Sequence, residues 1–289
     1  WTHAAALLFL SLGSTLSRSV AAQQGENLAQ GTVFADTNGN GQLDEGEAGI
    51  AGVAVSNGRD IVTSDAQGHY QIALAAVDDS MIFVLKPRNY ALPRSAEGVP
   101  QFWHQHDPDG SPRRRYVGAL PSGPLPEQLN FALIPQTEPE RFTVAMMADP
   151  QVKDPDEVEY YRRDVVASIS RHQGISLGFS LGDIVQDDLS LYPAMNEATA
   201  SLGIPWFNVF GNHDMNLDAE NDAGSDDTFA RYYGPTTYAM QYGPVHFIYF
   251  DDVIHWLDAA GQAEYHGGLT DNQLQFIANY LKRVPKQEW

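Results

Sequence analysis

Short apolar runs separated by turn residues fill the chain between Gly31 and Leu133. The clearest runs read GVAVS, HYQIAL, MIFVL and QLNFAL, at residues 52–56, 69–74, 81–85 and 128–133. Runs of this length, bounded by Gly, Pro, Asn and Asp, are typical of the strands of a β-sandwich. The pattern predicts a small all-β sandwich over residues 31–135, preceded by a polar lead at 23–30 and wrapped by the proline-rich stretch 86–128.

A different pattern begins after Arg141, where apolar segments alternate with helical ones. The segments 142–148, 175–181 and 205–210 are predicted strands, 154–172 and 190–202 are predicted helices, and a hairpin (238–242 with 245–250) and an amphipathic helix (271–283) follow. This alternation indicates βαβ units around a largely parallel, buried sheet. We therefore expect a second, α/β domain over residues 141–289, joined to the sandwich by the polar linker 134–140. Because such a sheet normally continues beyond a helix of this kind, we expect the domain to be incomplete at Trp289.

The first residues resemble a secretory signal. Residues 4–12 read AAALLFLSL, which is too short to span a bilayer, and small residues around Ser19–Ala22 offer a cleavage site. The chain starts at Trp1 without Met or a basic segment, so we interpret residues 1–22 as a partial signal peptide and expect a secreted or periplasmic protein. A buried first helix is the alternative. No later stretch is apolar and long enough to be transmembrane.

Composition excludes several classes of function. The formal net charge of −20 repels a phosphate-rich polymer, so broad nucleic-acid binding is not expected. The absence of cysteine excludes disulfides, zinc–thiolate sites and thiol nucleophiles. A serine hydrolase is also disfavoured, because there is no G-x-S-x-G motif and Ser180 lies within a predicted strand.

Polar side chains follow each of the three predicted parallel strands. Asp149 and Gln151 follow the first, Asp183 follows the second, and Asn212-His213-Asp214 follow the third. In open α/β sheets ligands gather at the carboxyl ends of the strands, so these side chains are expected to share one cleft.

The chemistry of this set suits divalent cations. The carboxylates of Asp149 and Asp183 and the amides of Gln151 and Asn212 supply oxygen ligands, and Asp183 could bridge two ions. His213 lies next to a ligand and is a candidate proton donor. We expect Asp214 to hydrogen-bond the ring of His213 and fix its orientation.

In their order and spacing, D-x-Q at 149–151, GD at 182–183 and GNHD at 211–214 resemble the first three motif blocks of the calcineurin-like metallophosphoesterases. The segments FARYYGPTTYAMQY at 229–242 and HGGLTDNQLQFIANYL at 266–281 also fit that family. The resemblance implies an αββα sandwich-type domain holding two divalent ions, Mn, Fe or Zn. It implies Asp149 and Gln151 on the first ion, Asp183 bridging, Asn212 on the second, and His213 near the leaving group.

Two departures from the family pattern affect the predicted site. Gln151 stands where the family more often has His, which leaves the identity of the metal open. The family's later histidine blocks are not found, and we expect them beyond Trp289, so that the chain as given is inactive or nearly so. We interpret His246, His255 and His266 as a strand residue, a surface-loop residue and a turn residue, not as ligands.

The front domain carries an acidic loop, DTNGNGQLDEGE, at residues 36–47. Its spacing matches a calcium-binding loop with Gly41 at the invariant glycine position, and the ligand positions are occupied by Asp36, Asn38, Asn40, Gln42, Asp44 and Glu47. The alternative is a turn with solvated charges. Predicted strands flank the loop, and the segment 31–93 resembles the calcium-binding B-type repeats of bacterial adhesins. His104 and His106 occupy alternate positions of one predicted strand. They could be metal ligands, but we prefer to interpret them as surface residues near an interdomain contact.

Hydrolysis of a phosphoric ester by a metal-activated water is the predicted function. A phosphorylated small molecule, a lipid or a nucleotide remains open as the substrate, as do mono- and diesters. The alternative is a non-enzymatic, calcium-dependent surface or matrix-binding protein with a degenerate phosphoesterase domain. The intact Asn212-His213-Asp214 favours the enzyme.

Overall fold

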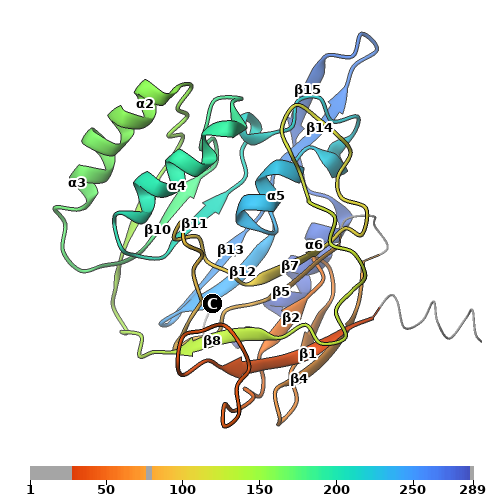
Figure 1. Cartoon of the computed structure of the whole chain (residues 1–289), viewed down its shortest axis with the longest axis vertical. Coiled ribbons are helices and arrows are strands. Elements are labelled where there is room, and N and C mark those ends of the chain that lie inside the picture. The colour runs from red at the N-terminus through yellow and green to blue at the C-terminus, as the bar shows by residue number, and fades with distance from the viewer. Residues whose placement is uncertain (1–27, 76–79, 287–289) are drawn as a thin grey trace, which may run out of the picture.

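The computed structural model describes residues 28–75 and 80–286 (Figure 1). The predicted signal at 1–22 lies outside this range. Among the described helices none has the length and apolar character needed to cross a membrane.

Two four-stranded sheets form the N-terminal half, which confirms the predicted sandwich. The first sheet is ordered β4 (His69–Ala73), β1 (Leu28–Ala35), β8 (Phe131–Pro135) and β6 (Tyr90–Ala91). The second is ordered β3 (Ile61–Thr63), β2 (Ala54–Ser56), β5 (Ser80–Val84) and β7 (Trp103–His106). Alternating apolar side chains such as Val33, Val55 and Ile82 are fully buried in the core. The first strand begins earlier than predicted, because Leu28 already pairs with Ala73.

A three-stranded parallel sheet, ordered β11-β10-β9, forms the centre of the second half, as the sequence predicts. Its strands are β9 (Thr143–Met147), β10 (Ile175–Leu181) and β11 (Trp206–Val209). The first crossover is one helical run, α2 (Pro155–Tyr160), the π-helical η1 (Tyr161–Val166) and α3 (Ala167–Ile169). Asp154 caps it by accepting a hydrogen bond from the Glu157 amide at 3.0 Å, and Pro155 starts it. The second crossover is the 3₁₀ turn η2 (Leu189–Leu191) followed by α4 (Tyr192–Ala200).

The rest of the second half contains two antiparallel hairpins and two helices. They are α5 (Asp227–Tyr233), β12 (Tyr238–Tyr242) with β13 (Val245–Tyr249), β14 (Val253–Leu257) with β15 (Ala263–Gly267), and α6 (Asp271–Leu281). The hairpin β12–β13 and helix α6 match their predicted positions. Thr270 and Gln273 form the capping box at which α6 begins.

The hairpin β14–β15 is absent from the sequence prediction, and two histidine assignments are wrong because of it. His255 lies in β14 and is 2% exposed, so it is not a surface-loop residue. His266 lies in β15, paired with Ile254, and not in a turn. The short strand β15 is mostly exposed and carries little apolar periodicity, so pairing with β14 defines it. His246 lies in β13, as predicted.

The two halves share one hydrophobic core. Phe83 of β5 contacts Phe276 of α6 with ring centroids 5.9 Å apart, and Phe102 contacts Tyr238 of β12 at 5.1 Å. The segment predicted as a polar linker takes part in this junction, because Glu138 is 4% exposed and pairs with Lys86 at 2.5 Å. The front sandwich is therefore packed directly against the elements that build the second half.

Candidate active site

The loops that follow β9 and β10 carry three of the predicted side chains on an unusual backbone. Asp149, Gln151 and Asp183 each have φ near +48°, in the left-handed region that side chains other than Gly seldom adopt. The Gln151 amide donates to the Asp183 carbonyl at 2.8 Å, which holds the first two loops together. Such local strain persists only where surrounding contacts enforce it and is concentrated at functional sites.

The third loop, which follows β11, is tied to Asp183. The backbone amide of His213 donates to Asp183 Oδ1 at 3.0 Å. A Cβ at Gly211 would lie 2.3 Å from that same carboxylate oxygen, so only glycine fits there. The structure thus brings Asp183 and the 211–213 turn into direct contact, as expected for strands whose carboxyl ends share one edge.

Asp214 lies beneath these loops. Its carboxylate is completely buried and accepts hydrogen bonds from the amides of Ile184 and Gly211, both at 3.1 Å, and from the Tyr192 hydroxyl at 3.1 Å. Burial raises the pKa of Asp214 to about 7, although these hydrogen bonds oppose that shift. Asp214 therefore connects the loop after β10 to the loop after β11.

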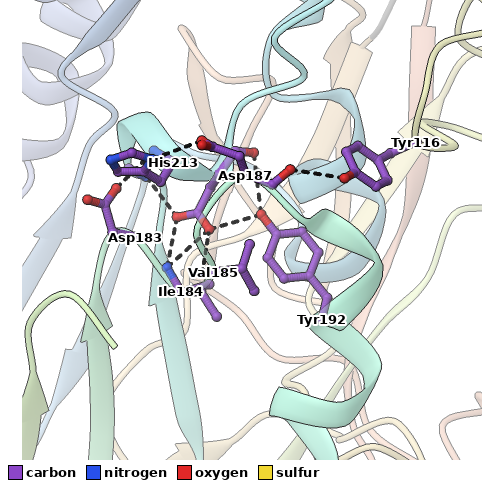
Figure 2. Close-up of polar contacts among 9 residues, drawn as sticks. Tyr116, Asp183, Ile184, Val185, Asp187, Tyr192 and His213 are labelled. Atoms are coloured by element: carbon purple, nitrogen blue, oxygen red, sulfur yellow. Dashed lines mark hydrogen bonds and ion pairs between the residues drawn. The ribbon is translucent and has the colours of Figure 1, made fainter. Parts of the chain in front are cut away.

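The predicted contact between Asp214 and the His213 ring is wrong. The 3₁₀ turn η3 (Asn212–Asp214) directs the Asp214 carboxylate inward, to the backbone amides of the neighbouring loop. The ring of His213 is instead held by Asp187, whose Oδ1 lies 2.8 Å from His213 Nδ1 (Figure 2). Asp187 also has a left-handed backbone, with φ +62°, and its amide donates to the His213 carbonyl at 3.1 Å.

Sequence reasoning missed Asp187. The one signal available was an additional carboxylate four residues after Asp183, within the same predicted loop. The pair is half exposed, with 29% of the His213 side chain and 40% of the Asp187 side chain accessible to solvent. The Asp187–His213 pair is therefore accessible to a ligand that enters from solvent.

The predicted metal ligands offer oxygen atoms without protein partners. Within the described ranges, the side chains of Asp149, Gln151 and Asn212 make no hydrogen bond to protein, and Asp183 uses only Oδ1. Free carboxylate and amide oxygens at one edge fit a divalent cation. Residues 28–75 and 80–286 bring together no group of three His, Asp or Glu side chains placed to hold a metal. The described donors are thus two carboxylates and two neutral amides.

The other histidines of this half are engaged in separate contacts. His246 Nδ1 lies 2.8 Å from the Tyr280 hydroxyl, and His255 Nε2 lies 2.9 Å from the Ala219 carbonyl. Both contacts place the rings in packing roles within the second half.

Two family models match this chain. The model described as "Calcineurin-like phosphoesterase" matches residues 142–288, and the one described as "N terminal of Calcineurin-like phosphoesterase" matches residues 37–117. This chain belongs to the calcineurin-like phosphoesterase family. Membership confirms the resemblance of the three motif blocks and the order of a β-rich front domain followed by a phosphoesterase domain. It also implies divalent metal ions, whose identity it leaves open.

No curated protein matches the chain significantly. Among solved structures, one match is a purple acid phosphatase, PPD1, from yellow lupin (Lupinus luteus) seeds. The identity is 12% and the TM-score 0.35, and the match covers 91% of this chain but 49% of the lupin chain. This calcineurin-like phosphoesterase chain therefore spans about half the length of that neighbour.

The acidic loop of the front domain lies between β1 and β2. Asp36 is 1% exposed and accepts hydrogen bonds from the amides of Gly39 at 2.6 Å and Gly41 at 2.8 Å. Glu47 Oε1 accepts from the Thr37 amide at 2.8 Å, and Asp44 Oδ2 accepts from the side-chain amides of two asparagines. The three carboxylates of the loop, Asp36, Asp44 and Glu47, thus accept hydrogen bonds from donors of the loop itself.

His104 and His106 lie on β7, as predicted, with ring centroids 6.5 Å apart. They are not surface residues, because His106 is 9% exposed and His104 is half-buried. Burial lowers the pKa of both rings, and His106 additionally lowers that of His104. Neutral rings of this kind contribute to the packing of the sandwich.

Proposed function

We propose that this protein hydrolyses a phosphoric ester by a metal-dependent mechanism with two divalent ions, Mn, Fe or Zn. The observation that carries the proposal is the convergence of Asp183, the 211–213 turn and the Asp187–His213 pair at the carboxyl ends of the parallel strands. Family membership supports phosphoester hydrolysis as the class of reaction. The substrate is a phosphorylated small molecule, whether a monoester, diester, nucleotide or lipid.

The site residues of this chain have two roles: some would bind the metal ions, and others would transfer a proton. Asp149 and Gln151 would hold the first ion, Asn212 the second, and Asp183 both. When bound, the ions supply an activated water and stabilise charge on the phosphoryl oxygens. His213 presents Nε2 to the leaving oxygen, because Asp187 occupies Nδ1. With Nδ1 held by Asp187, the His213 ring can donate a proton from Nε2 to the leaving group.

A direct test compares Asp183→Asn with Asp164→Asn in the full-length protein. Asp164 is an exposed helical carboxylate that pairs with Arg163, so its replacement should leave activity unchanged. We expect Asp183→Asn to lose phosphatase activity toward mono- and diesters together with bound metal, measured by elemental analysis. Normal activity and metal content in Asp183→Asn would overturn the proposal.

We also infer that the loop 36–47 binds one calcium ion through Asp36, Asn38, Asn40, Gln42, Asp44 and Glu47. The spacing of these residues supports the inference. In the alternative, a non-enzymatic surface protein, calcium binding by this loop would be the function of the protein. The half-exposed Asp187–His213 pair favours the enzyme, since an oriented and accessible imidazole can serve as a proton donor.

We propose that the protein is secreted or periplasmic, because the apolar run at residues 4–12 resembles part of a secretory signal.

A further inference from the structure

A segment of the front half reaches across to the loops of the candidate active site. Residues 107–123, here called the arm, follow β7 and contain no helix or strand. Figure 1 shows the arm, in yellow, passing α5. Arg114 forms a buried ion pair with Asp227 at the start of α5. The amide of Arg115 donates to Asp218 at 2.8 Å, and Arg231 donates to the Val117 carbonyl at 3.3 Å. These contacts anchor the arm on both sides of Tyr116.

Tyr116 extends from the arm to the loop that carries Asp187. Its hydroxyl donates to the Asp187 carbonyl at 3.0 Å and also lies 3.2 Å from Asp188 Oδ1 (Figure 2). The ring packs against the buried cluster of the second half. Burial and the nearby Asp188 raise the pKa of the phenol, so the hydroxyl remains a donor at neutral pH.

Asp187 depends on outside contacts for its conformation. It is a half-exposed residue with φ +62°, and a left-handed backbone is unfavourable for an aspartate that nothing holds. Its amide is bound by the His213 carbonyl and its own carbonyl by Tyr116. Between these two hydrogen bonds the side chain reaches His213 Nδ1 at 2.8 Å.

We propose that Tyr116 is a positioning residue of the active site, supplied by the front half of the chain. Its hydroxyl fixes the backbone of Asp187, and Asp187 in turn orients His213 toward the leaving oxygen. This inference rests on the proposed phosphoester hydrolysis. Through Tyr116, the arm would give the front half of the chain a role in catalysis.

The test replaces Tyr116 by Phe, which keeps the ring and removes the hydroxyl. The matched control is Tyr160→Phe, since the Tyr160 ring is 52% exposed at the end of α2. Both variants are assayed in the full-length protein loaded with Mn²⁺, with an alkyl phosphate and with p-nitrophenyl phosphate. The alkyl ester needs its leaving oxygen protonated, whereas nitrophenolate leaves readily without a proton.

We expect Tyr116→Phe to lower kcat for the alkyl ester by roughly 10-fold or more, the usual cost of losing an orienting partner, and to leave its KM unchanged. Turnover of the nitrophenyl ester and both activities of Tyr160→Phe should stay near wild type. Asp188→Asn, which retains the bond from Tyr116 to the Asp187 carbonyl, should have a smaller effect than Tyr116→Phe. Equal losses on the two esters, or no loss on either, would overturn the positioning role.

A second readout separates this inference from the proposed function. The proton on His213 Nδ1, held by Asp187, should give a downfield NMR signal that disappears in Asp187→Asn. We expect the signal in the wild-type protein and in Tyr160→Phe, and its broadening or loss in Tyr116→Phe. If the wild type hydrolyses neither ester, the proposed function fails, and this signal still decides the role of Tyr116. An unchanged signal in Tyr116→Phe would refute that role.

Discussion

At the scale of single residues, the chemistry of the candidate site depends on His213 and its carboxylate partner. The pair is bonded at 2.8 Å and partly open to solvent. In the full-length protein we expect His213→Ala to lower turnover of an alkyl phosphate by roughly 10²–10⁴-fold, the usual contribution of a proton donor. Metal content should stay nearly normal, as elemental analysis would check. Full activity of His213→Ala on this poor leaving group would contradict the assigned role.

Asp251 allows a prediction for stability against pH. Burial raises the pKa of Asp251 to about 8, with added repulsion from Asp226, Asp222 and Asp252, while its bond from the Val253 amide opposes the shift. The folded state therefore holds a proton that the unfolded state, with a pKa of 3.8, releases. Stability should fall as pH rises between these two values.

The substitution Asp251→Asn removes this titration and keeps an oxygen for the Val253 amide. Urea unfolding of the variant at pH 5 and pH 8 should show a smaller loss of stability than in the wild type. The same loss in both proteins would mean that Asp251 is not the titrating group.

At the scale of elements, a buried ion pair joins the sandwich to the hairpin β12–β13. Lys86 Nζ lies 2.5 Å from Glu138 Oε1 and donates to the Gln241 carbonyl at 2.7 Å. Glu138 Oε2 accepts from the Gly243 amide at 2.8 Å, in the turn of that hairpin. Burial lowers the pKa of Lys86, and Glu138 opposes this shift.

Removing one partner should leave an uncompensated buried charge. We expect Glu138→Gln to lower the free energy of unfolding by about 3–5 kcal/mol, measured by urea denaturation. The control is Arg88→Gln, whose pair with Glu140 is exposed and should change stability by less than about 1 kcal/mol. Similar small losses in both variants would show that the buried pair does not hold the halves together.

Calcium binding by the loop between β1 and β2 can be tested in the same way, by substitution of one residue. Glu47→Gln weakens the proposed bidentate ligand, so it should lower calcium affinity and reduce the rise in melting temperature that calcium produces. The matched control is Glu45→Gln, an exposed neighbour outside the ligand positions. Equal melting temperatures of the wild type in calcium and in a chelator would refute calcium binding by this loop.

At the scale of the whole molecule, the number of metal ligands limits what the chain can bind. The candidate donors are Asp149, Gln151, Asp183 and Asn212, and residues 28–75 and 80–286 place no cluster of three metal-binding side chains together. Two close cations repel each other and need a full shell of ligands. With these four oxygen donors alone we expect weak binding of at most one divalent ion, checked by elemental analysis after dialysis against Mn²⁺, so the second ion of the proposed mechanism needs further ligands. Two tightly bound ions would require other ligands, and His246, His255 and His266 would be reconsidered first.

The amino-acid sequence alone predicts the order of sandwich and α/β domain, most strand positions and the polar groups at three strand ends. These features follow from the local period of apolar residues and from covalent spacing, as the match of 175–181 with β10 illustrates. The folded chain was needed to show that Asp187 and not Asp214 contacts the His213 ring, and that Tyr116, 71 residues earlier, donates to the Asp187 carbonyl. Side-chain direction in a left-handed loop and contacts between distant segments depend on how the two halves pack, which local spacing does not encode.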